Sequence, residues 1–521
     1  MEVPSVRADY PRVCRRAAVR LAVALIVPAS VCLAAEPAPA PAAAPSAVAS
    51  GGAVLQVSLR EAMLTALENN RALAVERLSP AIVKTAEEQA QAVFDPVVGA
   101  AVSTSRGHAE SLGADGGFHD VVEDETSVTG SVRRAFASGT TVEAAVDTTV
   151  ADSSYSDQVT SSGGSVSVTQ ALLRGRSVAA NLARIRQARL ATASSEYEVR
   201  GVIEALAADV EDTYWDLALA ERRIGIYTES LKVAEQYLRE TRDRIAAGTV
   251  AEIELAAAEA EIPLRRQGLI NANGAMQINR LRLLRLLNPS GDGFWDRPVR
   301  LTDQPTTPAV ALDPVADHVA VALQKRPDLS QARLQVDLQE LEIVRTRDGL
   351  LPRLDAFIAL GKTGYARAFP ESLWHLGHDT YAVSGGLTYE YALGNRDAKA
   401  SHRHAVLSRE QADAAVANLV QLIELDVRAA YVNVGTAYEQ VAASAATRRL
   451  REETLRAETE KSRVGKSTSF LVAQAQRDLL VSQIAEVEAM VSLLHSMTTL
   501  YRLESSLLDR RGIVLGEAPR D

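Results

Sequence analysis

The chain has 521 residues, of which 47% are apolar and 23% are charged, and its formal net charge is −10. An acidic chain without a basic stripe is a poor candidate for binding nucleic acid. Aromatic residues make up only 4% of the chain, and the abundant alanine favours long helices that pack through small side chains over a bulky globular core.

The first 35 residues are organised like an export signal. Arginines precede an apolar run that is too short to span a membrane comfortably and that ends in small side chains. Residues 36–56 follow as a flexible Pro/Ala/Gly-rich linker. Both cysteines, Cys14 and Cys32, lie in the signal, so the exported chain is expected to have neither disulfides nor thiolate metal sites. Lipidation of Cys32 stays open.

The rest of the chain contains two copies of one pattern. ALENNRAL at 66–73 aligns with ALQKRPDL at 322–329, and DVEDTY at 209–214 aligns with DVRAAY at 426–431. Each copy predicts a helix, a β region, a very long helix, a glycine turn and a further helix. Copy one (57–287) has helix 58–93, β region 94–173, long helix 178–245 and helix 252–287; a linker (288–316) precedes copy two (317–508), with helix 317–350, β region 351–393, long helix 397–463, helix 468–508 and a tail at 509–521.

Both long helices carry apolar residues at intervals of seven, which is typical of a coiled-coil seam. Copy two has one interruption, at Arg448. The seam positions are Ile203, Val210, Leu217, Ile224, Leu231, Leu238 and Ile245 in copy one, and Val420, Val427, Val434, Val441 and Leu455 in copy two. A helix of this length would be roughly 100 Å long, which excludes a compact domain.

Gly248 and Gly465 occupy matching places after the two long helices. The segment around Gly465, RVGKSTSF, has the end of a phosphate-binding loop, but Glu460 stands where that motif needs its first glycine, and no apolar strand precedes it. A glycine that tolerates positive φ is instead what the reversal of a helical hairpin requires. Ser467 and Thr468 can then cap the following helix.

Six segments of the β regions alternate between apolar and polar residues, near 97–105, 126–136, 140–150, 164–173, 353–361 and 381–391. Their length and pattern fit strands that cross a membrane in a barrel, although a soluble β-sandwich cap would bury one face equally well. No run after the signal is expected to form a transmembrane helix. Such an exported chain is periplasmic, secreted or an outer-membrane β-barrel.

The mature chain resembles the TolC family of outer-membrane efflux proteins over nearly its whole length. The resemblance is carried by the order and duplication of short segments between the heptads: SLREAMLTALENN at 58–70, FDP at 94–96, VTQALLRGR at 168–176, KRPDL at 325–329, LLPRLDAF at 350–357 and GKSTSFLVAQAQRDL at 465–479. It implies a mainly α fold with transmembrane β structure: a long antiparallel coiled-coil tunnel and a β-barrel shared between the protomers of a trimer.

The resemblance also implies a function, the exit duct of a tripartite efflux pump or a type I secretion system. The implied partners are the other protomers, a periplasmic adaptor (membrane fusion protein), an inner-membrane transporter and outer-membrane lipid. The hairpin tips would dock the adaptor, and residues beyond them would narrow the entrance. The docking candidates are Gly248, Thr249, Gly465, Lys466, Ser467 and Thr468, and the constriction candidates are Glu254, Leu471 and Gln474.

Two further expectations concern the arrangement. Helix 252–287 is expected to stack end to end with 327–350, and 468–508 with 71–93. The family usually has four strands per protomer, so either all six strands form the barrel wall or the hairpin around 137–140 folds outside it. We find no nucleophile–base pair or metal-ligand cluster, so neither an enzyme nor a cofactor is predicted. A structural coiled-coil scaffold of the cell envelope is the alternative function.

Overall fold

The computed structural model describes residues 54–112, 116–154, 156–249, 251–290, 293–306, 312–377 and 380–514. The expected signal at 1–35, the linker as far as residue 53 and the tail beyond residue 514 lie outside these residues. The elements below all belong to one unit of the chain, Gly52–Asp521.

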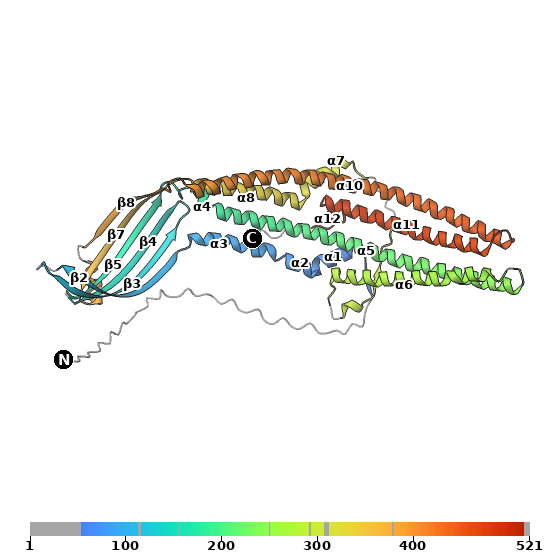
Figure 1. The fold of residues 1–521 in the computed structure, drawn as a ribbon, viewed down its shortest axis with the longest axis horizontal. Coiled ribbons are helices and arrows are strands. Elements are labelled where there is room, and N and C mark those ends of the chain that lie inside the picture. Colours follow the sequence, from blue (N-terminus) through green and yellow to red (C-terminus); the bar gives the residue numbers. More distant parts are fainter. Residues whose placement is uncertain are drawn as a thin grey trace, which may run out of the picture. The chain divides into compact units, whose positions relative to one another are not determined.

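Two antiparallel helical hairpins form the larger part of the described chain (Figure 1). They are α5 (Ala183–Ala246, 64 residues) with α6 (Glu254–Leu287), and α10 (Arg396–Arg463, 68 residues) with α11 (Ser469–Leu503). The predicted heptad residues lie at the contacts: Val210 and Leu217 of α5, like Val427 and Val434 of α10, are almost fully buried. α11 also packs along α5, so both hairpins share one core.

Arg448, which interrupts the predicted seam of copy two, has acidic partners in the structure. Its Nε lies 2.6 Å from a carboxylate oxygen of Glu486 on α11, and its Nη1 lies 3.1 Å from a carboxylate oxygen of Glu452. A charged side chain at a seam position is tolerated when a carboxylate on the facing helix pairs with it. The two helices therefore stay in contact through this position.

Among the described residues, α11 is the one helix whose length and hydropathy would allow it to cross a membrane. We expected no such run after the signal. The apolar side of α11 nevertheless lies inside the bundle, because its heptad residues Leu480, Val487, Leu494 and Tyr501 are all buried. Its apolar character is explained by packing against α10 and α5.

Several helices predicted as single are interrupted. Asn70 ends one helix and caps the next, since its Oδ1 accepts the Leu73 N–H and its Nδ2 donates to the Leu286 carbonyl. Pro80 and Pro327 each stand in the first turn of a helix, where proline fits best. The segments are α1 (Leu59–Asn69), α2 (Arg71–Glu76) and α3 (Ser79–Gln91) in place of 58–93; α4 (Val178–Asn181) ahead of α5; α7 (Val315–Lys325) and α8 (Pro327–Gly349) in place of 317–350; and α11 followed by α12 (Leu507–Arg510) in place of 468–508.

The predicted end-to-end pairing of helices is wrong within this chain. The C-terminal end of α6 meets the start of α2, where Asn288 Nδ2 donates to the Asn69 carbonyl at 2.9 Å. The end of α11 instead meets α7, the helix before α8, through Glu504 and His318. α6 therefore lies in line with α3 along α5, and α11 lies in line with α8 between α5 and α10. Helix lengths alone allow either pairing.

All six long strands belong to one antiparallel sheet in the order β2-β3-β4-β5-β7-β8 (Figure 1). The hairpin around 137–140 therefore lies within the sheet and not outside it. Its Gly139 has φ of 77°, and a Cβ there would lie 2.3 Å from the Gly175 carbonyl oxygen. The strands are β2 (Val97–Leu112), β3 (Phe118–Ala135), β4 (Thr140–Ser153), β5 (Ser156–Ala171), β7 (Arg353–Ala366) and β8 (Ala382–Glu390), and β1 (Leu55–Val57) pairs in parallel with β6 (Val299–Leu301) elsewhere.

Four short helical turns complete the described elements. They are η1 (Ala92–Phe94), η2 (Phe294–Asp296), α9 (Phe369–Trp374) and η3 (His375–Gly377). The turn between β3 and β4 lies on the side of the helices, since the Ala137 carbonyl accepts from Asn181 beside α5. The β7 to β8 connection, which contains α9 and η3, is at the opposite end of the sheet, farthest from the hairpins (Figure 1).

Candidate functional site

The register of the sheet separates its residues into an apolar face and a polar face. Paired residues point to the same side of a sheet, so a row of successive partners can be followed across all six strands. One such row is entirely apolar: Val98, Val132, Ala144, Val166, Leu360 and Val383. Val166, Leu360 and Val383 are 47%, 53% and 63% exposed. An exposed apolar face of this extent fits contact with lipid.

The neighbouring row lies on the other side of the sheet and is largely polar. It consists of Val97, Arg133, Glu143, Ser167, Ala359 and Ser384. On this face the carboxylate of Asp147 covers Gly163, where a Cβ would lie 2.8 Å from Asp147 Oδ1. The two faces continue the alternation seen in the sequence of β4 and β8, with one side fit for lipid and the other for a water-filled lumen.

Both hairpin tips end their long helix with the same backbone motif. Gly248 and Gly465 have φ of 70° and 73°. In copy one the Thr249 N–H donates to the Arg244 carbonyl and the Gly248 N–H to the Ile245 carbonyl, both at 2.9 Å. In copy two, Lys466 N–H donates to Lys461 and Gly465 N–H to Ser462 in the same pattern. This is a Schellman ending, which needs a left-handed residue at the position of the glycine.

The residues after Gly465 differ from the sequence-based expectation in one detail. Thr468 is the N-cap of α11, and its side chain accepts the Leu471 N–H. Ser467 does not cap the helix, because its hydroxyl donates to Glu458 Oε2 at 2.7 Å. Glu458 also pairs with Lys461, and these contacts fix the turn on the side of α10.

The tips also expose apolar side chains that the sequence analysis did not single out. Ile253 is 84% exposed, Val464 68% and Phe470 55%. They stand beside the six docking candidates in both tips, which makes each tip a small apolar surface on a polar hairpin. In the sequence these residues are apolar positions outside the heptad seam. An analysis that follows only the heptad positions does not detect them.

Of the three constriction candidates, Glu254 joins the two hairpins. It is the first residue of α6, and its Oε2 accepts the Ser469 N–H at the start of α11 at 2.9 Å. The first N–H groups of a helix lack partners within the helix, and the helix dipole favours a carboxylate there. Leu471 and Gln474 lie on the exposed side of α11, whereas the adjacent Val472 and Ala473 are buried.

The sequence matches the family described as Outer membrane efflux protein over residues 63–289 and 319–504. The chain belongs to the outer membrane efflux protein family. The resemblance to TolC-type proteins is therefore confirmed. Members of this family are channels and not enzymes, so the chain is an outer-membrane efflux channel that extends into the periplasm. No curated protein sequence matches it significantly.

Solved outer-membrane channels share the fold of the efflux channel at low sequence identity. CmeC of Campylobacter jejuni has 14% identity and a TM-score of 0.64, with 86% of this chain and 86% of that chain covered. VceC of Vibrio cholerae has 15% identity and a TM-score of 0.63, covering 86% and 95%. MtrE of Neisseria gonorrhoeae has 16% identity and a TM-score of 0.61, covering 86% and 89%.

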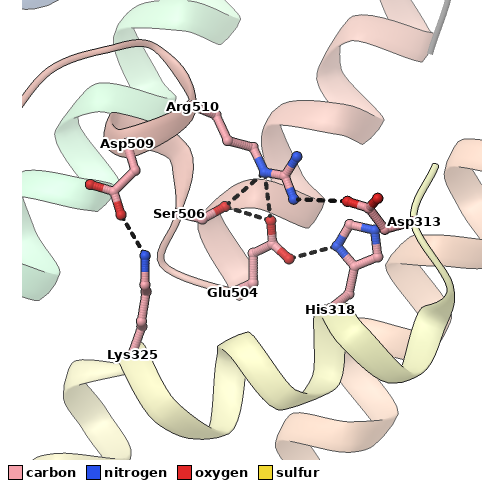
Figure 2. A network of polar contacts seen from close by, with 7 residues as sticks. All are labelled: Asp313, His318, Lys325, Glu504, Ser506, Asp509 and Arg510. Atoms are coloured by element: carbon pink, nitrogen blue, oxygen red, sulfur yellow. Dashed lines mark hydrogen bonds and ion pairs between the residues drawn. The ribbon is translucent and has the colours of Figure 1, made fainter. Parts of the chain in front are cut away.

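A buried polar network joins the two ends of copy two near the middle of the efflux channel's helices (Figure 2). Glu504 is fully buried, and its Oε2 lies 2.6 Å from Nδ1 of the buried His318 on α7. Its Oε1 accepts from Ser506 and from Arg510 Nε at 3.1 Å. At the edge of the network Arg510 faces Asp313, and Lys325 pairs with Asp509. The network holds the C-terminal turn against α7.

A second buried carboxylate, Glu204 on α5, is less completely paired: it receives a backbone hydrogen bond from Leu508 and lies near Arg200 and Lys325. It is 5% exposed, and its Oε2 accepts no hydrogen bond. Burial raises the pKa of Glu204 to about 7, an effect that Arg200 opposes and Asp509 increases. A carboxyl that keeps its proton longer in the folded chain than in the unfolded chain destabilises the fold as pH rises.

We expect Glu204→Gln to raise the melting temperature of the efflux channel at pH 8. Below pH 4.5, the ordinary pKa of a glutamate side chain, both states are protonated and burial costs no ionisation energy. Between pH 4.5 and 7 the unfolded chain loses the proton first, so the folded state becomes less stable by an amount on the order of 3 kcal/mol. The gain should therefore shrink as pH is lowered from 7 to 4.5. Thermal unfolding of Glu196→Gln, an exposed site on the same helix, provides the control; equal gains for both variants at all pH values would contradict the prediction.

Proposed function

We propose that the chain is a trimeric outer-membrane channel that serves as the exit duct of a tripartite efflux pump or a type I secretion system. It would let small molecules or polypeptides pass without catalysis. The observation that carries this proposal is the sheet: an apolar row crosses all six strands, a polar row lies on the opposite face, and both edge strands, β2 and β8, are open. An open sheet edge is not tolerated in lipid.

Assembly of three protomers would remove these edges. Each β8 would pair with the β2 of a neighbouring protomer, and six strands from each of three protomers would give an eighteen-stranded barrel. With strands about 4.8 Å apart and tilted by about 40°, such a barrel has a backbone diameter of roughly 35 Å, against roughly 25 Å for the twelve strands that the family resemblance implies. The extra hairpin in copy one thus supports a wide outlet.

Exposed apolar side chains on the helices support the same assembly. Ile82 on α3, Ile270 on α6 and Leu425 on α10 are 67%, 70% and 62% exposed. Side chains of this kind along helix faces are expected to pack against the helices of neighbouring protomers, which would enclose a tunnel in the periplasm. The exposed tips around Gly248 and Gly465 are then the surface offered to a periplasmic adaptor, and through it to an inner-membrane transporter.

The test is a single-channel recording of the detergent-purified protein in a planar bilayer. A duct should migrate as a trimer and pass a steady current. An eighteen-stranded barrel should have a higher conductance than a twelve-stranded one. A structural scaffold of the cell envelope, the alternative function, should pass no current. A folded, membrane-inserted trimer without conductance would overturn the proposal.

We expect Glu254→Ala to increase the conductance of this channel. The substitution removes the acceptor of the Ser469 N–H and with it a direct link between the two hairpin tips, so the entrance can widen. Glu252→Ala, two residues earlier and exposed, is the matched control, since it removes the same charge without that link. Equal conductance of the two variants would show that the link does not hold the entrance.

A further inference from the structure

The short helix α9 is folded back onto the apolar face of the sheet. The register of β5 and β7 pairs Ser162 with Gly364, and both lie on the same face as Val166 and Leu360. Ser162 Oγ lies 2.7 Å from Ser372 Oγ of α9, and Lys362 Nζ donates to the Leu376 carbonyl just after it. α9 therefore covers this face at the end farthest from the helical hairpins, where the β7 to β8 connection begins.

The part of the face beneath α9 is polar, unlike the apolar row that contains Val166 and Leu360. Thr148 and Ser162 are hydrogen-bonded neighbours there, and Thr160 and Ser162 are each only 1% exposed. Gly364 provides the space, because a Cβ at this position would lie 2.1 Å from the Ser372 carbonyl oxygen. Hydroxyl groups facing lipid without partners would be costly; α9 covers this patch, and its Ser372 pairs with Ser162.

The outer side of α9 is apolar and aromatic. Phe369 is 50% exposed, Leu373 is 44% exposed and Trp374 is 84% exposed. Proline in the first turn favours the helix at this point. The exposed side chains continue the apolar surface of Val166 and Leu360 over the polar patch. An indole this exposed buries little surface within the described chain, and indoles favour the boundary between lipid headgroups and acyl chains.

We propose that α9 is a membrane-surface anchor whose Phe369, Leu373 and Trp374 insert at the headgroup boundary of the outer lipid leaflet. This inference rests on the proposed function, since the apolar face must be the outside of a barrel. The outer leaflet is the one concerned because the helical hairpins extend into the periplasm and α9 lies at the opposite end of the strands. α9 thus restores an apolar outer surface where the strands become polar.

The test uses the fluorescence of Trp374 in vesicles of phosphatidylcholine whose acyl chains are brominated near the headgroup. The chain has three tryptophans, so W215F/W295F leaves Trp374 alone, and W215F/W374F leaves Trp295 alone as the matched control. We expect brominated lipid to quench Trp374 and not Trp295, which lies in η2 beside α6. The difference between the unsubstituted chain and W374F gives the same signal without the other substitutions. Trp374 emission that is equal in brominated and ordinary vesicles would overturn the proposal.

Gly364→Ala tests whether packing on the sheet holds α9 in the lipid. Its new methyl group would collide with Ser372, whereas Gly361→Ala on the same strand places a Cβ 3.6 Å from its nearest neighbour, an ordinary contact. We expect the quenching of Trp374 to be lost in G364A and kept in G361A. Undiminished quenching in G364A would contradict the role of this contact.

Conductance separates this inference from the proposed function. Each variant is first shown to form a trimer and to conduct in a planar bilayer. A conducting channel without quenching of Trp374 refutes the anchor alone, whereas an inserted protein that never conducts refutes the channel itself.

Discussion

Glu261→Ala is expected to lower the free energy of unfolding by about 3–5 kcal/mol, because it leaves a buried guanidinium without its counter-charge. Arg265 is 1% exposed and pairs with Glu261 one turn away on α6. Its Nε donates to Ser230 of α5 at 2.8 Å, and Arg477 of α11 lies 3.3 Å from the other oxygen of Glu261. The Glu261–Arg265 pair thus connects three helices: the carboxylate contacts α11 and the guanidinium contacts α5.

Chemical denaturation of the detergent-solubilised protein measures this effect. Glu259→Ala is the control, since the ion pair of Glu259 with Arg242 is about half exposed on the same hairpin and should contribute less than about 1 kcal/mol. The double variant E261M/R265M should recover most of the loss, because apolar side chains of similar volume often replace a buried ion pair without cost. A loss that is as large in the double variant as in Glu261→Ala would contradict this explanation.

Glu504→Ala is expected to have an effect of similar size, about 3–5 kcal/mol, at the network in Figure 2. The carboxylate is fully buried, and its loss leaves the Nδ1 of the buried His318 without its partner. The Nε2 of the same ring already has none. Arg510 would keep only Ser506, the distant Asp313 and the ring of Tyr501. Unpaired buried polar groups are the main cost.

Asp313→Ala is the matched control for this network, because Asp313 is mostly exposed and lies 3.8 Å from Arg510. It should change the unfolding free energy by less than about 1 kcal/mol. Limited proteolysis adds a local readout: in Glu504→Ala the turn that contains α12 should become accessible to protease while the hairpins stay protected. An unchanged cleavage pattern together with unchanged stability would show that the network contributes little.

The long helices and the strands could be predicted from the sequence because their signals are local and periodic. The heptads of α5 and α10 and the alternation in β4 and β8 depend only on neighbouring residues. The break at Asn70 could not, since an asparagine within a helical run becomes a cap only when a distant group, here the Leu286 carbonyl, holds its side chain. The swapped stacking of α6 and α11 has the same origin: helix lengths are local, but end-to-end pairing depends on contacts between residues far apart in the sequence, such as Asn288 with Asn69 and Glu504 with His318.

The candidate site was predicted unevenly for similar reasons. Gly248 and Gly465 could be found because a hairpin turn imposes a left-handed conformation that glycine adopts readily. Sequence analysis could not find the link from Glu254 to Ser469 or the buried pair of Glu261 and Arg265. In sequence, an acidic and a basic residue four positions apart on a helix are usually a solvated surface pair. Only the packing of α5 and α11 over α6 makes this pair a buried one.

The two unpaired borders of the six-stranded sheet bear on the genetics of the proposed assembly. When neighbours complete one another's hydrogen-bond ladders, a single defective β2 or β8 leaves an unsealed seam in every complex that contains it. Co-expressed with normal chains, such a subunit would therefore spoil most mixed complexes and act as a dominant inhibitor of export, whereas a chain that is never made would be recessive.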